Sequence, residues 1–183
     1  MAGNPPDYAF PGIDVRYTPA ICLMTKAGYA HDRTAWNMTA NLDPGALDTA
    51  ADEARLTEQG VRIRRAEADD IARLRPVIAA EFGSHWAAEI TTAQAVHIGL
   101  RGGAPIAFAA WGCTRPSWFG PMGTLPDAKG LGIGSVLLKR CLLDQSKAGY
   151  AQAQIGWVGP VPFYAQTVAA RIERVFFLYA KEL

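Results

Sequence analysis

The pattern of apolar and polar positions is clearest around three alternating glycines, Gly130, Gly132 and Gly134. From the second of them onwards, apolar residues recur with the spacing of a helix that buries one face. These residues are Ile133, Leu137, Leu138, Cys141 and Leu142. The first turn of such a helix presents unpaired N–H groups and the positive end of the helix dipole. Because glycine also lets a ligand approach the backbone closely, the pattern predicts an anion-binding loop ahead of a half-buried helix.

Shorter patterns predict the elements that precede this loop. The expected elements are a strand at 61–65, a helix capped at its N-terminus by Asp69–Asp70, a short helix at 85–94, and strands at 95–100, 106–113 and 118–124. The first strand alternates apolar and charged side chains, as a half-buried strand does. Arg101-Gly102-Gly103 indicates a hairpin. Pro121 and two glycines predict an edge strand or a bulge within 118–124.

The N-terminal part of the chain has a pattern of its own. A turn at 9–19 leads into a helical run at 20–26, and the stretch up to Leu42 alternates as strands do. The same order of turn, short helix and strand returns between Val158 and Leu183, which predicts a faint internal repeat. The expected boundaries are 1–43 for this half-module, 44–60 for an exposed helical linker and 61–183 for the main domain.

Composition narrows the class of protein. The chain has 183 residues, of which 50% are hydrophobic, so it can bury one core and still carry an appendage. With 18 basic and 17 acidic residues the net charge is +1, and no nucleic-acid surface is expected. The apolar runs are far shorter than the roughly 20 residues of a membrane span, and the polar start does not resemble a signal peptide. We therefore expect a cytoplasmic protein with no membrane partner.

The glycine loop fits neither of two common nucleotide-binding motifs. A P-loop ends in Gly-Lys-Ser/Thr, whereas here Lys129 precedes the glycines and Ser135 follows Gly134 directly. A dinucleotide fingerprint needs a third Gly or Ala where Ser135 stands and an acidic residue about 20 positions later, where this chain has glutamines.

The loop instead resembles the acetyl-CoA-binding signature of the GCN5-related N-acetyltransferases, Gln/Arg-x-x-Gly-x-Gly/Ala. Here it reads Lys129-Gly130-Leu131-Gly132-Ile133-Gly134. A second stretch, Gly-Trp-Val-Gly-Pro-Val-Pro-Phe-Tyr at 156–164, lies where the family has the exit of its fifth strand and a helix bearing a tyrosine. Two features depart from the family pattern: Lys129 replaces Gln or Arg, and no Asn follows the fifth strand. The resemblance implies an α/β fold (α+β mixed sheet), the acyl-CoA N-acyltransferase fold, with a strongly bent sheet flanked by helices.

The resemblance also implies acetyl-CoA as cosubstrate and no metal. In this family the fourth and fifth strands splay apart, and the gap holds the pantetheine arm. Backbone N–H groups near 122–125 would polarise the thioester carbonyl. The implied cofactor-binding residues are Met122, Gly123, Thr124, Leu125, Lys129, Gly130, Leu131, Gly132, Ile133, Gly134, Ser135 and Phe163.

By the same resemblance, Tyr164 is the acid that protonates the departing thiolate. A positioned acid is typically worth 10² to 10⁴ in rate. The alternative is that Tyr164 only packs beside Phe163. The general base stays open, because the family commonly builds its acceptor pocket between the first two helices, where several residues qualify. The candidates for contact with the acceptor there are Glu81, His85, Trp86 and Glu89.

The sequence therefore predicts an N-acetyltransferase that moves acetyl from acetyl-CoA to a primary amine by direct transfer in a ternary complex. The acceptor, a small molecule or a peptide, stays open. The half-module at 1–43 would extend the same sheet or pack on a partner subunit, so a homodimer is one expected assembly. Two alternatives are a non-catalytic acyl-CoA-binding regulatory module and a structural or interaction protein whose CoA loop is a relic.

Overall fold

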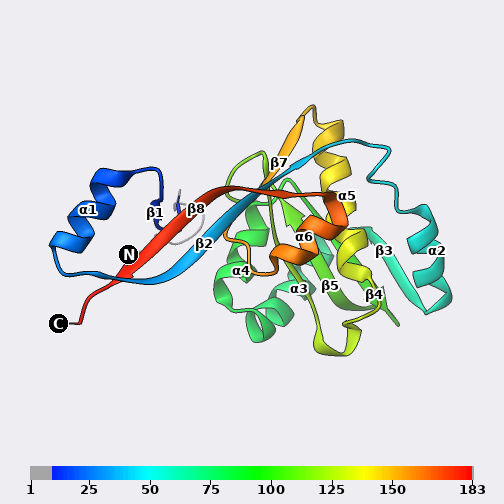
Figure 1. Cartoon of the computed structure of the whole chain (residues 1–183). Helices are drawn as coiled ribbons and strands as arrows, with labels where there is room; N and C mark the ends of the chain where they lie inside the picture. The colour runs from blue at the N-terminus through cyan, green and yellow to red at the C-terminus, as the bar shows by residue number, and fades with distance from the viewer. Residues whose placement is uncertain (1–9, 183) are drawn as a thin grey trace.

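One eight-stranded sheet organises the computed structural model, which describes residues 10–182 (Figure 1). The strands are β1 (Ile13–Asp14), β2 (Ala30–Asn41), β3 (Val61–Arg65), β4 (Ala95–Arg101), β5 (Ala104–Trp111), β6 (Trp118–Thr124), β7 (Gln152–Ile155) and β8 (Arg171–Ala180). Their order is β1-β8-β2-β7-β6-β5-β4-β3. Neighbours pair antiparallel except β6 and β7, which are parallel.

Helices cover both faces of this sheet. They are α1 (Thr18–Lys26), α2 (Ala50–Glu58), α3 (Ala68–Glu81), α4 (Ser84–Glu89), α5 (Ile133–Lys147) and α6 (Val161–Val168), with short 3-10 turns at Ile90–Thr92 and Pro126–Ala128. The predicted α/β class with a mixed, helix-flanked sheet is confirmed. Within the described residues, no helix is long and apolar enough to cross a membrane.

Helix α5 buries the face that its spacing predicts. Each of the five apolar residues in the predicted stripe is at most 1% exposed. Strand β5 shows that the core has two layers, because its side chains alternate between them: Ala109 belongs to the cluster under α5, and Phe108 to the cluster that α3 and α4 cover. Burial of this stripe fixes the start of α5, and with it the glycine loop, against the sheet.

Helix α3 begins earlier than predicted, because its N-cap is two to three residues before the expected cap at Asp69–Asp70. Its N-cap is Glu67, whose N–H donates to Asp70 over 2.9 Å in a capping box. The Asp70 carboxylate also accepts from Arg64 Nη2 at 2.8 Å and from Arg73 Nη2 at 2.7 Å. The Arg64 guanidinium holds the pKa of Asp70 well below its usual range. Asp70 therefore ties β3 to α3 in addition to capping the helix.

The irregularity predicted in 118–124 is a bulge, and the edge-strand alternative is wrong. Strand β6 lies between β5 and β7, so both of its edges have neighbours. Its register against β5 shifts between Ala109 and Trp111, and Gly120 next to the shift has a φ of +117°. A positive φ of this kind is readily adopted only by glycine.

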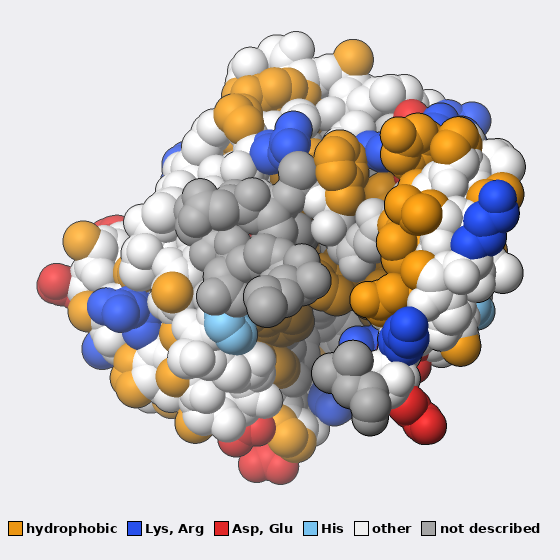
Figure 2. Space-filling view, turned by 90° about the vertical axis from the view of Figure 1, so that its left-hand side faces the viewer, with side chains coloured by type: hydrophobic (Ala, Val, Ile, Leu, Met, Phe, Trp, Pro, Cys, Tyr) orange, Lys and Arg blue, Asp and Glu red, His pale blue; other side chains and the backbone are white. Residues whose placement is uncertain are grey.

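Strand β2 lies inside the sheet, between β7 and β8. Its inner half contributes Met38 and Ala40, which are 1% and 0% exposed, to the main core. The outer halves of β2 and β8 form a two-stranded ribbon that leaves the domain and carries β1 and α1 (Figure 1). Helix α1 buries none of its residues, and its Leu23 is exposed. Figure 2 shows hydrophobic side chains on the surface at this end of the molecule.

The segment 44–60, predicted as an exposed helical linker, contains helix α2 and packs on the domain through two leucines. Leu47 and Leu56 are 2% and 0% exposed and belong to the main core. Glu53 Oε1 accepts a hydrogen bond of 2.6 Å from Arg140 Nε on α5. The segment has few apolar residues, but Leu47 in the loop before α2 and Leu56 in α2 both reach the main core and attach the segment to the domain.

Candidate active site

A cavity of about 520 Å³ lies where β6 and β7 part. Among the described residues, their parallel ladder joins only Trp118 to Gln154 and Phe119 to Ile155. Beyond these two pairs the chains diverge, as the family resemblance implies. The cavity is lined by β6, by residues 155–160, by α6, and by α4 with the loop after β5. A gap of this form offers an extended ligand the unpaired edge of a strand.

The glycine loop has the backbone that the alternation predicts. Gly130 and Gly132 both have a φ of +83°, a left-handed conformation that side chains disfavour. Gly132 is the N-cap residue of α5, and Ile133 behind it is 1% exposed, so the first turn of the helix is held against the core. The loop and helix start therefore form an anchored site of the kind that binds phosphate oxygens.

The structure brings part of the predicted cofactor set to the cavity. The members that line it are Met122, Gly123, Thr124 and Phe163. Leu125 and residues 129–135 lie outside the lining. The loop nevertheless reaches the cavity wall, because a Cβ on Gly134 would lie 3.4 Å from Met122 Cε and 3.6 Å from Phe163 Cζ. The loop therefore lies next to one part of the cavity wall.

Only part of the backbone at 122–125 is free to face a ligand. The Leu125 N–H donates to the Ile106 carbonyl over 2.9 Å. Since N–H groups alternate in direction along a strand, those of Met122 and Thr124 point away from β5, towards the side on which β7 has parted. Of the backbone N–H groups at 122–125, those of Met122 and Thr124 are thus the candidates for polarising a bound carbonyl.

Tyr164 lies on α6 and lines the cavity. Its ring packs edge-on against Phe119 and Phe163, with centroids 6.2 and 5.0 Å away, and the residue is 7% exposed. Burial raises the pKa of Tyr164 to about 12, so the hydroxyl is protonated at neutral pH. Tyr164 therefore packs against its aromatic neighbours and also lines the cavity, where the resemblance implies a proton donor.

The opposite wall comes from α4. Trp86 stacks on Phe82 with centroids 5.6 Å apart, and Glu89 Oε1 accepts a 2.8 Å hydrogen bond from the Thr114 hydroxyl. Burial raises the pKa of Glu89. Both residues line the cavity, as does Thr114.

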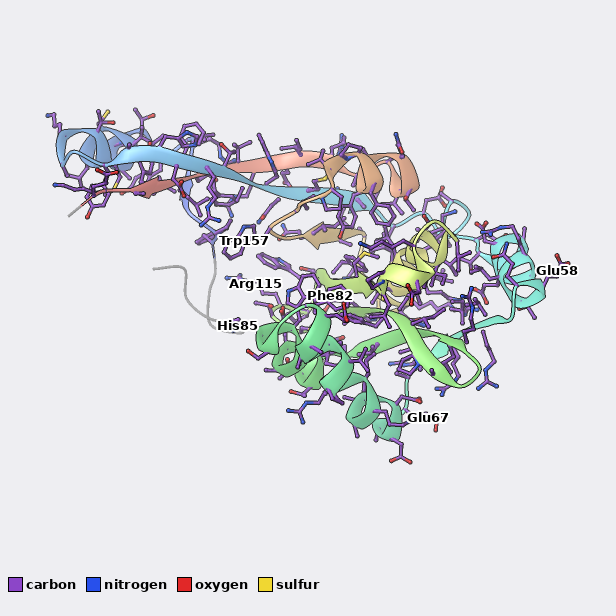
Figure 3. The ribbon with its side chains drawn as sticks, turned by 90° about the horizontal axis from the view of Figure 1, so that it is seen from below. Glu58, Glu67, Phe82, His85, Arg115 and Trp157 are labelled. Atoms are coloured by element: carbon purple, nitrogen blue, oxygen red, sulfur yellow. The ribbon has the colours of Figure 1, made fainter. Side chains whose placement is uncertain are left out.

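The other two acceptor candidates lie outside this wall. Glu81 and His85 are exposed and do not line the cavity. Figure 3 shows His85 and Phe82 on the side of α3 and α4, while Trp157, which lines the cavity, lies on the side of the β2–β8 ribbon. Glu89 is thus the member of the predicted set whose carboxylate faces the cavity.

Sequence reasoning missed a cation beside the glycine loop. Arg55 on α2 donates from Nη1 to the Leu131 carbonyl over 3.0 Å, and its Nη2 would lie 2.9 Å from a Cβ on Gly132. Its side chain is 44% exposed. Lys129, which the resemblance implies as a cofactor-binding residue, is exposed in the loop itself. No sequence motif predicts this position of Arg55, because it depends on how α2 packs against α5.

An asparagine also reaches the exit of β7, although none follows that strand in the sequence. Asn37 on β2 accepts a 2.9 Å hydrogen bond from the Trp157 N–H and is 6% exposed. Gly156 next to it is needed for space, because a Cβ there would come within 2.7 Å of the Trp118 ring. The exit of β7 is therefore held by β2 and β6 together.

No family model matches the chain, and no curated protein matches its sequence. Solved structures match its fold. A GCN5-related glucosamine N-acetyltransferase region of a fungal multi-domain GH3 β-N-acetylglucosaminidase has a TM-score of 0.76 at 15% identity and covers 94% of this chain and 24% of its own. A GCN5-related N-acetyltransferase from Sphaerobacter thermophilus has a TM-score of 0.69 at 17% identity, with coverages of 93% and 58%. A GCN5-related N-acetyltransferase from Kribbella flavida has a TM-score of 0.58 at 15% identity, and the match covers 85% of this chain and 60% of that structure.

At these identities the likeness concerns the fold. The chain has the fold of the GCN5-related N-acetyltransferases, and the resemblance predicted from the glycine loop is confirmed at that level. The chain spans less than two thirds of each of these three structures, at 24%, 58% and 60%.

Proposed function

We propose that this chain is an acetyl-CoA-dependent N-acetyltransferase that passes acetyl directly to a primary amine in a ternary complex. The observation that carries the proposal is the cavity between β6 and β7, which has Tyr164 in one wall and Glu89 in another and lies beside the glycine loop. These are the three parts that acyl transfer from a thioester needs: a cradle for the phosphates, a proton donor and a proton acceptor.

In this proposal the first turn of α5 and Arg55 hold the phosphates of acetyl-CoA, and the edge of β6 pairs with the pantetheine amides. The N–H groups of Met122 and Thr124 stabilise negative charge on the carbonyl oxygen. Tyr164, whose raised pKa keeps its hydroxyl protonated at neutral pH, gives its proton to the departing thiolate.

The acceptor is the open part of the proposal. One solved structure with this fold is described as a glucosamine N-acetyltransferase region, so glucosamine belongs among the amines to be tested. Peptide N-termini and free amino acids complete the classes to be compared. Binding of acetyl-CoA without turnover of any amine would favour the non-catalytic acyl-CoA-binding module.

Binding of acetyl-CoA is tested first, by the melting temperature. At about 100 times the dissociation constant, ligand binding adds roughly 2.7 kcal/mol, which for a domain of this size raises the midpoint by about 5 to 11 °C. Gly134→Glu should abolish the rise, because its side chain would point into the contact with Met122 and Phe163. Lys147→Gln, in the last turn of the same helix, is the matched control and should retain it. No rise in the unsubstituted protein at saturating acetyl-CoA would refute the proposal.

We also propose that residues 1–43 are a half-module that repeats the end of the main domain. In support, the order β1-α1-β2 parallels the order β7-α6-β8. Two backbone hydrogen bonds also correspond: Val15 N–H donates to the Val175 carbonyl at 3.0 Å, and Val158 N–H to the Trp36 carbonyl at 2.8 Å.

A further inference from the structure

We propose that the cavity selects a protonated primary amine that carries no carboxylate, and that Glu89 binds the amine nitrogen and takes its proton. This inference rests on the proposed acetyltransferase function and names the acceptor class for the same cavity.

The geometry of Glu89 supports this role. It is the last residue of α4, and it is half-buried at the cavity wall. Oε1 accepts from the Thr114 hydroxyl at 2.8 Å, which fixes the carboxylate. Among the described residues no side chain or backbone group donates to Oε2. A half-buried carboxylate at a cavity wall, with one oxygen that accepts no hydrogen bond from the described residues, is a site for a cation that brings its own N–H groups.

The charge of the lining points to the same class of ligand. Among the described residues that line the cavity, Glu89 is the one with a charged side chain. Cys113, next to Thr114 in the chain, stays neutral because burial raises its pKa to about 12. Arg115 lies over the Trp118 ring, 5.6 Å from its centroid, and does not line the cavity. A ligand carboxylate would therefore meet the negative charge of Glu89 without a cation in the lining to offset it.

Aromatic walls define the rest of the ligand. Trp86 is held by stacking on Phe82, and the Trp118 indole N–H donates to Gln154 Oε1 at 2.6 Å. Both rings are thereby fixed, and both line the cavity. Fixed aromatic faces favour an apolar or planar body, and they also attract a cation.

The proton balance of the step is complete with the residues present. Glu89 takes one proton from the ammonium group, and the neutral amine attacks the thioester carbonyl carbon. The C–N bond forms and the C–S bond breaks, while Tyr164 gives its proton to the leaving sulfur. The nitrogen then loses its second proton, which restores the Tyr164 hydroxyl directly or through water. The products are the N-acetyl amine and free CoA thiol, with one proton left on Glu89 for solvent.

The test compares amines with the amino acids from which they differ by one carboxylate. The pairs are phenethylamine with phenylalanine, isopentylamine with leucine, and cadaverine with lysine. Release of CoA thiol is measured for each, together with the acetyl-CoA-induced rise in melting temperature. We expect kcat/KM to be at least tenfold higher for the amine in the acetylated pairs.

Glu89→Gln keeps the acceptor for Thr114 but removes the charge. It should lower kcat/KM for the amines by about 10² or more and remove the acidic limb of their pH profile. It should leave the acetyl-CoA-induced rise in melting temperature unchanged. Glu81→Gln, an exposed glutamate outside the lining, is the control and should change none of these.

Three outcomes would overturn the inference: preference for the amino acids, unchanged kcat/KM in Glu89→Gln, or no acetylation of any of the six compounds by a protein that binds acetyl-CoA. The last leaves the cofactor site intact, whereas loss of acetyl-CoA binding in the unsubstituted protein would refute the proposed function itself. The two failures are therefore distinguishable.

Discussion

Trp36 and Val175 face each other in the ladder between β2 and β8, and the carbonyl of each accepts a hydrogen bond from a backbone N–H outside this ladder. Val158, just after β7, donates to Trp36, and Val15, just after β1, donates to Val175. The ribbon is therefore hydrogen-bonded in equivalent ways along its two edges, by the residue after β1 on the β8 side and by the residues after β7 on the β2 side. One consequence is that β2, although it precedes the domain in sequence, occupies an internal position of the domain's sheet.

The first prediction follows from that position. Deletion of residues 1–43 should abolish cooperative folding of the remainder, because Met38 and Ala40 are buried in the main core and β7 loses its antiparallel neighbour. Circular dichroism during urea titration tests this, with a chain lacking only residues 1–9 as control. A cooperative transition of 44–183 at the midpoint of the full chain would contradict it.

The second prediction concerns Tyr164. Tyr164→Phe should lower kcat by about 10² to 10⁴ while leaving acetyl-CoA affinity nearly unchanged, because the ring contacts with Phe119 and Phe163 remain and only the proton donor is lost. Steady-state kinetics with any acetylated amine measures the loss. Activity equal to that of the unsubstituted protein would mean that another group protonates the thiolate.

The third prediction concerns Arg55. Arg55→Gln should weaken acetyl-CoA binding about fivefold, equivalent to about 1 kcal/mol for a partly exposed charge-assisted contact. The difference should shrink at about 1 M salt, where exposed charges are screened. Arg62→Gln, exposed on β3, is the control. Titration calorimetry at two salt concentrations measures both variants, and equal affinities at low salt would exclude Arg55 from the phosphate site.

The parts that could be predicted from sequence are those whose signal is local. The stripe on α5 and the alternation of Gly130 and Gly132 each lie within one segment, so periodicity and backbone preference were sufficient to locate the loop. Arg55 and Asn37 could not be predicted, because each reaches the site from a segment 76 or 120 residues away from its partner. Their positions depend on how α2 and β2 dock, which no local pattern encodes.

The same limit explains the acceptor wall. Glu81 and Glu89 have the same side chain and lie on successive helices, and the sequence gives no reason to prefer either. In the folded chain Glu89, at the end of α4, lines the cavity, whereas Glu81, at the end of α3, is exposed outside it. The position of Tyr164, by contrast, could be predicted because the resemblance covers its own helix.

The fourth prediction is a pH dependence of stability that arises from His97. This residue, on β4, is 4% exposed, and its Nε2 lies 2.8 Å from Asp144 Oδ2 on α5. Among the described residues, its Nδ1 has no hydrogen-bond partner. Burial lowers the pKa of His97 despite the opposing effect of Asp144. The folded protein therefore binds fewer protons at this site than the unfolded chain does between the lowered pKa and the unfolded value of about 6.5.

Since the unfolded state binds more protons in that window, the free energy of unfolding should be fully retained above about pH 6.5 and should fall as the pH decreases through the window. The raised pKa of Glu89 acts in the opposite sense. Urea midpoints between about pH 5 and 8 measure the slope. His97→Gln cannot take up the proton, so its midpoint should vary less with pH over this range. An equal slope in both proteins would assign the dependence to another group.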